Sequence, residues 1–163
     1  MSATIAMRMA RIEGIQLSRL VDDFVELVGS DRDLSDPAVN RLAPDAYPGD
    51  AEAAREFREA TRADLFDRRL HDAEVVRHAL SAVRTDDELT EAEAFIELDV
   101  TLTAADADAW LRTLAALRLV IAARLGIERD DDHDPEDARY GIYDWLGYRL
   151  EVIVQAADEL DGS

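Results

Sequence analysis

The clearest hydrophobic pattern in the chain lies between Thr103 and Ile127. Apolar residues recur there at intervals of three and four, which is the period of a helix with one buried face. Thr103 with Asp106 is typical of a helix N-terminus, and Arg124 followed by Gly126 is typical of a C-terminus. We therefore expect a helix here, with its apolar face at the centre of the core. That face consists of Trp110, Leu111, Leu114, Leu117, Ile121 and Leu125.

Three further stretches show the helical period. Residues 14–29 carry an apolar face that ends near Gly29, and residues 51–83 form a long segment rich in strong helix formers. Residues 140–160 are apolar on two sides, and the second side is formed by Trp145, Tyr148 and Val152. Such a helix is either enclosed on both sides or offers one side to a partner. We therefore predict an interaction face at Trp145, Tyr148 and Val152.

Two short segments alternate between apolar and polar residues, which is the period of a half-buried strand. They are residues 4–9 and residues 96–102, and an acidic loop at 85–93 precedes the second. A lone strand has unpaired backbone groups, so the simplest solution pairs the two segments. The predicted fold is therefore mostly α, a single domain over residues 1–163. It is a helical bundle of about four main helices with a small two-stranded antiparallel ribbon.

Composition narrows the function classes. The 37 acidic and 18 basic residues give a net charge of −19, and every basic residue is an arginine. A surface this negative repels nucleic acid and anionic lipid, so we expect neither as a partner. No segment approaches the roughly 20 uncharged apolar residues of a membrane span. The chain has no cysteine, which excludes thiolate chemistry and cysteine-type zinc sites. We expect a cytoplasmic protein.

Charged residues on apolar helix faces are the candidate site. In one interpretation they neutralise one another inside the bundle, because a buried guanidinium without a carboxylate or carbonyl partner is costly. In the other they form a pocket where arginines grip a carboxylate or phosphate. Asp64, Arg68 and Asp72 stand four apart, a spacing that allows pairing along one helix. The full set is Glu13, Asp64, Arg68, Asp72, Arg118, Arg124 and Arg149.

We expect no metal and no cofactor. The acidic loop of residues 127–139 offers oxygen ligands at Asp130, Asp132 and Asp134. A calcium-binding EF-hand loop, however, needs glycine at its sixth position and glutamate at its twelfth. Those positions hold Pro135 and Gly141 here. The loop therefore does not match a calcium site.

Four short patterns resemble one known family. They are RLxPDAY at residues 41–47, EFRxxTxxDL at 56–65, LRL with RLG between 117 and 126, and YxWL at 143–146. The chain is similar in these places to an actinobacterial family of domains of unknown function. Its genes usually lie beside those of the Clp-protease adaptor ClpS and a JAMM-type metalloprotease. The resemblance implies no established activity, and the gene neighbourhood makes a proteolysis-linked partner one candidate.

Three functional hypotheses follow. The first is a non-catalytic interaction or regulatory module that binds another protein or forms a homodimer, and we do not expect an enzyme. The second is a small-anion-binding protein or enzyme that uses the Arg/Asp cluster. It predicts an open pocket with at least one arginine that has no protein partner. The third is a transcriptional regulator, for which the long segment would need a continuous basic stripe, yet glutamates interrupt its arginines.

Overall fold

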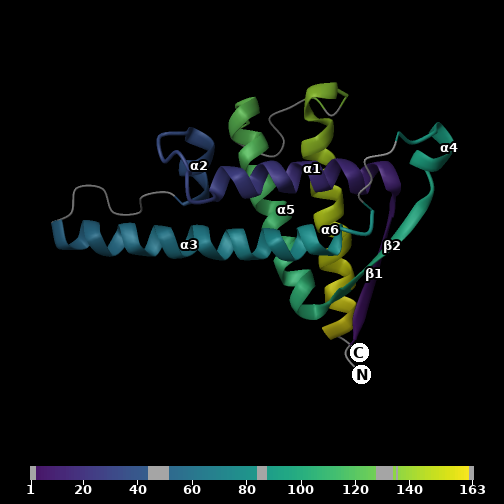
Figure 1. Ribbon diagram of the computed structural model, residues 1–163, viewed down its shortest axis with the longest axis horizontal. Coiled ribbons are helices and arrows are strands. Elements are labelled where there is room, and N and C mark those ends of the chain that lie inside the picture. The colour runs from purple at the N-terminus through teal and green to yellow at the C-terminus, as the bar shows by residue number, and fades with distance from the viewer. Residues whose placement is uncertain (1–2, 44–51, 84–87, 128–133, 135, 162–163) are drawn as a thin grey trace.

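The computed structural model describes residues 3–43, 52–83, 88–127, 134 and 136–161. The described chain is mostly helical and has one small sheet, which confirms the expected fold class (Figure 1). In chain order the elements are β1 (Thr4–Ala10), α1 (Arg11–Val28), α2 (Pro37–Leu42), α3 (Glu52–Ala79), α4 (Glu91–Ala94), β2 (Glu97–Thr103), α5 (Ala104–Leu125), the 3-10 helix η1 (Ala138–Tyr140) and α6 (Gly141–Asp161).

The two strands pair antiparallel, as predicted, with Met7 opposite Val100 at the middle of the ribbon. Ile5, Met7 and Met9 are buried on one face of β1 because alternate side chains of a strand point to the same side. Strand β1 runs straight into α1, and β2 runs straight into α5. Since the strands are antiparallel, these two helices start from opposite ends of the ribbon.

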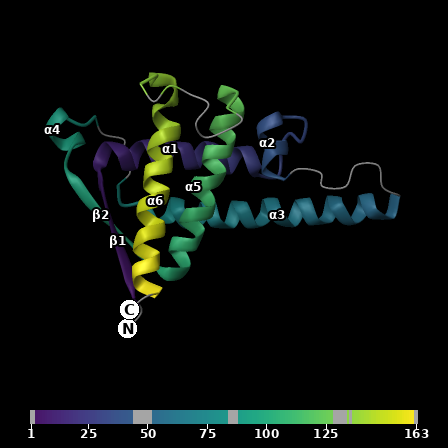
Figure 2. The same cartoon turned by 180° about the vertical axis from the view of Figure 1, so that it is seen from behind.

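The four long helices form two crossing pairs. Helices α1 and α3 lie side by side and run in opposite directions, and α5 and α6 form a second antiparallel pair across them (Figures 1 and 2). Helix α5 contacts both α3 and α6, so its apolar residues sit at the crossing. Trp110 and Leu114 are fully buried there, which confirms α5 as the centre of the core.

Local sequence signals account for both ends of α5. The Thr103 hydroxyl accepts a hydrogen bond from the Asp106 amide at 3.1 Å, and the Asp106 carboxylate accepts one from the Thr103 amide at 3.5 Å. Gly126 ends the helix in the left-handed conformation with φ of 75°, a region in which a Cβ is disfavoured. Both signals were correctly predicted.

Three boundaries differ from the predictions. Helix α1 begins at Arg11 instead of residue 14, because the Glu13 carboxylate accepts a hydrogen bond from the Ala10 amide and closes the first turn. Helix α3 ends at Ala79, and residues 80–83 form a turn. Residues 91–93, expected within the acidic loop 85–93, form the short helix α4 together with Ala94, and the Thr90 hydroxyl caps its first turn.

The first half of α3 projects beyond the other helices (Figures 1 and 2). Phe57 lies in this half and is 74% exposed, whereas Phe66, nine residues later, is buried in the core. The apolar stripe predicted for this segment therefore continues past the part of the helix that the core covers. We call residues 56–65 the α3 arm.

Among the helices of the described residues, none combines the length and the apolar character needed to cross a bilayer.

Candidate functional site

Glu13 and Arg149, which are 136 positions apart, meet where β1 runs into α1. Their Oε2 and Nη2 atoms are 2.8 Å apart, and the same Oε2 accepts the Trp145 indole N–H at 2.6 Å. The Nη1 of Arg149 donates to the Arg8 carbonyl at 2.8 Å. Burial raises the pKa of Glu13, but the hydrogen bonds from Arg149, Trp145 and the Ala10 amide outweigh this, so the pKa lies below its ordinary value. Glu13 thus has all three of these donors inside the fold, while the buried Nε of Arg149 has no hydrogen-bond partner among the described residues.

Arg118 lies between α5 and α6. Its guanidinium stacks over the Tyr143 ring at 4.0 Å, and its Nε donates to the Tyr143 carbonyl at 3.1 Å. A Cβ at position 147 would come within 3.0 Å of the Arg118 Nη2. Gly147 therefore provides the room in which α6 packs against this arginine.

Arg124 joins the end of α5 to the start of α2. It makes two 2.7 Å hydrogen bonds to the Asp36 carboxylate, which also accepts the Ala38 amide as the N-cap of α2. The hydrogen bonds from Arg124 and Ala38 hold the pKa of Asp36 below its ordinary value. This pair therefore fixes a helix terminus.

The residues spaced four apart on α3 do not pair along the helix. Asp72 instead accepts two hydrogen bonds from Arg112 of α5, at 2.8 and 3.1 Å. Asp72 faces α5, where a planar guanidinium can bind both carboxylate oxygens at once. Asp64 and Arg68 are exposed, and neither has a hydrogen bond or ion pair to another described residue. The predicted charge cluster is thus divided among four separate places.

The three residues of the predicted interaction face have different surroundings. Tyr148 is exposed and Val152 is half-buried. Trp145 packs against the core, and its indole N–H is bonded to Glu13. A carboxylate inside the fold therefore takes up the polar edge of the tryptophan, and the outward part of this face is smaller than the sequence pattern indicates.

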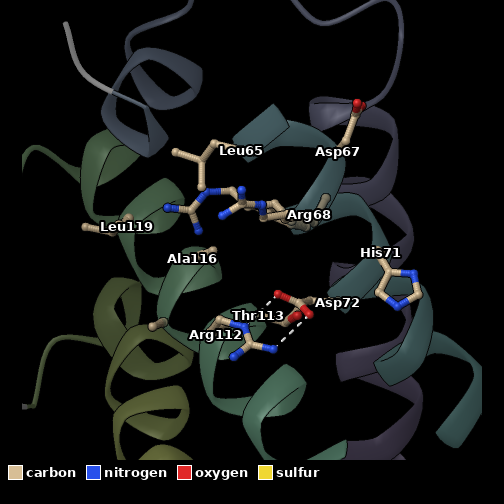
Figure 3. A pocket seen from close by; sticks show the side chains of 12 residues that line it. Leu65, Asp67, Arg68, His71, Asp72, Arg112, Thr113, Ala116 and Leu119 are labelled. Carbon is tan, nitrogen blue, oxygen red and sulfur yellow. Dashed lines mark hydrogen bonds and ion pairs between the residues drawn. The ribbon is translucent and has the colours of Figure 1, made fainter. Parts of the chain in front are cut away.

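A cleft between α3 and α5 brings Arg68, Asp72 and apolar side chains together. Its volume is about 710 Å³. Figure 3 shows Leu65, Arg68 and Asp72 reaching from α3 toward α5, whereas His71 points away from α5. The apolar part of the lining is Phe24, Leu65, Ala115, Ala116 and Leu119.

Charged residues of both signs line this cleft, with the arginines outnumbering the aspartates by one: Arg68, Arg69 and Arg112 stand with Asp67 and Asp72. Arg69 donates to the Leu42 carbonyl at 2.9 Å, while its buried Nε has no hydrogen-bond partner. Burial lowers the pKa of Arg69 below its ordinary value, and the charge of Asp72 opposes that change. The hydrogen bonds that Arg112 donates to the Asp72 carboxylate raise the pKa of Arg112. Arg68 stands beside these groups with its guanidinium exposed.

Within the described residues, no three His, Asp or Glu side chains converge as metal ligands. The acidic loop positions Asp130, Asp132 and Pro135 lie outside the residues that the structure describes.

Comparison with known proteins places these elements in a family. The family model described as a domain of unknown function, DUF2017, matches residues 1–157. The chain belongs to the DUF2017 family. It is also 33% identical over 132 residues to a protein of Mycobacterium leprae named "Putative oxidative stress regulator AosR". That match covers 74% of this chain and 58% of the relative, so the chain spans less than two thirds of the relative's length. No solved structure matches the chain.

The cleft of this DUF2017 protein includes residues that the sequence reasoning did not select, above all Arg112 and Leu119. Arg112 stands 40 positions from Asp72, and no local spacing rule connects residues so far apart. Leu119 lies between Arg118 and Val120 on a helix that is apolar on most sides, so periodicity alone does not single it out.

Proposed function

We propose that this protein is a non-catalytic regulatory module that binds a helix of another polypeptide in the cleft between α3 and α5. The observation that carries the proposal is that one cleft combines an apolar lining with an arginine whose guanidinium makes no hydrogen bond to another described residue. Leu65 of α3 and Leu119 of α5 both line the cleft, and Arg68 lines it without a hydrogen bond to any other described residue. Grooves of this kind bind amphipathic helices by their apolar face.

The composition of the cleft indicates the chemistry of the partner. Ala115 and Ala116 leave room for a large aliphatic or aromatic side chain between the two leucines. A carboxylate placed one helical turn from that side chain can form charge-assisted hydrogen bonds with Arg68. Because the remainder of the chain is strongly acidic, the arginines of the cleft also orient an acidic partner toward it.

The relative's name supports a regulatory role and raises the question of how an oxidative signal would be received. These 163 residues contain no cysteine. Met7 and Met9, the internal methionines, are buried in the ribbon and so are shielded from oxidants in solution. Any part that these residues play in such a response would therefore depend on contact with other proteins and not on a thiol of their own.

Two matched substitutions test the function. Leu119→Glu places a charge on the wall of the cleft, and Ile142→Glu makes the same change on α6, outside the cleft, at a residue of similar exposure (36% and 46%). Each variant is used to capture proteins from host lysate, and each captured protein is then purified and titrated. We expect a partner that retains its affinity for Ile142→Glu and binds Leu119→Glu at least roughly tenfold more weakly. Equal binding to both variants by every purified partner would refute the cleft as the docking surface.

A second candidate function is small-anion binding. The Nε of Arg69 and the guanidinium of Arg68 favour it, because neither has a hydrogen-bond partner among the described residues. Citrate and inorganic phosphate are suitable probes, with amide chemical shifts as the readout. Binding in the cleft would shift residues of α3 and α5 together, and Arg68→Gln would remove the effect. No shift at millimolar probe would exclude this candidate.

A further inference from the structure

The α3 arm carries an apolar stripe that leads directly into the cleft. Phe57, Thr61 and Leu65 are spaced by four residues, so they lie along one face of the helix. Leu65 is itself part of the cleft wall, while Phe57 is the most exposed large apolar side chain of the described residues. One helix therefore presents both an unfilled groove and a side chain of the kind that fills such a groove.

We propose that the α3 arm packs against the α3 arm of a second copy of this chain, and that Phe57 of each copy contacts the cleft of the other at Leu65. The two arms pack antiparallel about a two-fold axis at Thr61. This inference rests on the proposed function, because it takes the cleft as a binding surface and names the side chain that contacts it. In this register Phe57 of each copy lies opposite Leu65 of the other. The contact is isologous, so one operation places a Phe57 at the Leu65 end of both clefts.

The charges along the arm fit the same register. Two residues face each other across an antiparallel pair when they stand equally far from the axis on opposite sides. Asp64 follows Thr61 by three positions, and position 58, which is an arginine in the sequence, precedes it by three. Asp64 is exposed and has no ion pair to another described residue, so it is available for a partner. The register thus places positions 58 and 64 opposite one another twice in the dimer.

The spacing also suits close packing of two helices. Phe57, Thr61 and Leu65 repeat every four residues and form one ridge, which can pack beside the same ridge of a second helix. At the axis each copy would contribute Thr61, whose hydroxyl already donates to its own Phe57 carbonyl at 2.9 Å. Its small side chain, satisfied within its own helix, allows the two backbones to approach.

Sedimentation equilibrium of the full chain, from micromolar to submillimolar concentration, tests the dimer. Phe57→Glu should weaken the association on the order of 100-fold, because each dimer loses two aromatic contacts worth about a factor of ten apiece. Phe95→Glu is the matched control, since Phe95 is also exposed (64%) but lies at the end of α4. Both variants replace exposed side chains, so circular dichroism should show an unchanged helix content.

Charge reversal tests the register. Arg58→Asp and Asp64→Arg should each weaken the dimer, because each places like charges opposite one another. An equimolar mixture of the two variants should associate as strongly as the wild type, since opposite charges then face each other at both positions. Thr61→Cys supplies a second readout. The chain has no other cysteine, so mild oxidation should cross-link two copies through residue 61, whereas Glu74→Cys should not cross-link.

The outcomes separate this inference from the proposed function. A chain that sediments as a monomer throughout overturns the dimer and leaves Leu119-dependent binding of another protein standing. A dimer that is indifferent to Phe57→Glu and to charge reversal also overturns it, because the association then uses another face, such as that of Tyr148. A dimer that shows both effects supports the inference even when no other protein depends on Leu119.

Discussion

Removing the Glu13 carboxylate should destabilise the protein by about 2 kcal/mol. Hydrogen bonds to a charged group contribute roughly 1.5–3 kcal/mol, and breaking a fully buried ion pair costs about 3–5 kcal/mol. The Arg149 side chain is only 11% exposed, but Glu13 is 30% exposed, so water partly screens their interaction and the lower end applies. In Glu13→Ala the Arg149 guanidinium keeps its hydrogen bond to the Arg8 carbonyl. The Trp145 indole N–H loses its acceptor.

A double-mutant cycle isolates this interaction. Glu13→Ala, Arg149→Met and the double variant are unfolded in urea at neutral pH, where both groups are charged. If the two side chains act as one unit, the double variant should lose about 1 kcal/mol less than the two single losses combined. Additive losses of unfolding free energy, or a loss below about 0.5 kcal/mol for Glu13→Ala, would refute the coupling of Glu13 to Arg149.

The contacts of Glu13 also make the stability of the protein fall at low pH. The folded pKa of Glu13 lies below the ordinary value of 4.5, since the hydrogen bonds to the ionised carboxylate outweigh its burial. A lowered folded pKa stabilises the protein above the unfolded pKa, and this contribution is lost as the pH falls through the folded pKa. The difference in unfolding free energy between the wild type and Glu13→Gln should therefore shrink as the pH is lowered below about 4.5. A difference that stays constant would contradict the assigned direction.

Three further changes test packing and backbone geometry by urea unfolding. Gly14→Ala should lower the unfolding free energy by about 1 kcal/mol, because its Cβ would lie 3.0 Å from Val83 Cγ2 and overpacking outweighs the gain in helix propensity. Equal or greater stability would show that the Val83 side chain moves aside without cost. Gly126→Ala should also lose about 1 kcal/mol, since its φ of 75° disfavours a Cβ although the space is open; no loss would mean the backbone shifts. Ser18→Ala should gain about 0.5–1 kcal/mol, as its buried hydroxyl has no hydrogen-bond partner within the described chain; a loss would reveal a bound water.

Features that depend on neighbouring residues could be predicted from the sequence. Thr103, Asp106 and Gly126 act within one turn of the helix ends, so their spacing alone identified α5. The strands followed from strict alternation, and their pairing followed from the need to satisfy backbone groups. The start of α1 was missed because Ala10 is not a usual capping residue. The cap instead comes from Glu13 inside the helix, which a search for polar N-caps overlooks.

The arrangement of charges could not be predicted, because it depends on how the helices cross. Asp72 stands one turn from Arg68, and the rule for neighbours on a helix favours that pair. Where α3 crosses α5, Arg112 instead donates two hydrogen bonds to the Asp72 carboxylate, and Arg68 does not pair with Asp72. Glu13 was recognised as a partner for a core arginine, but only the approach of α6 to the ribbon shows that this arginine is Arg149.

The geometry of arginine explains how these charges are held at separate places in the fold. A guanidinium donates in several fixed directions, so Arg149 can bind a carboxylate and a carbonyl at once, and Arg124 can grip both oxygens of Asp36. A lysine ammonium, as a point charge, would satisfy neither geometry so fully. Most of these donors are used within the fold, although the buried Nε of Arg149 has no hydrogen-bond partner among the described residues. Arg68 differs from them, because it lines the cleft and has no hydrogen bond to another described residue.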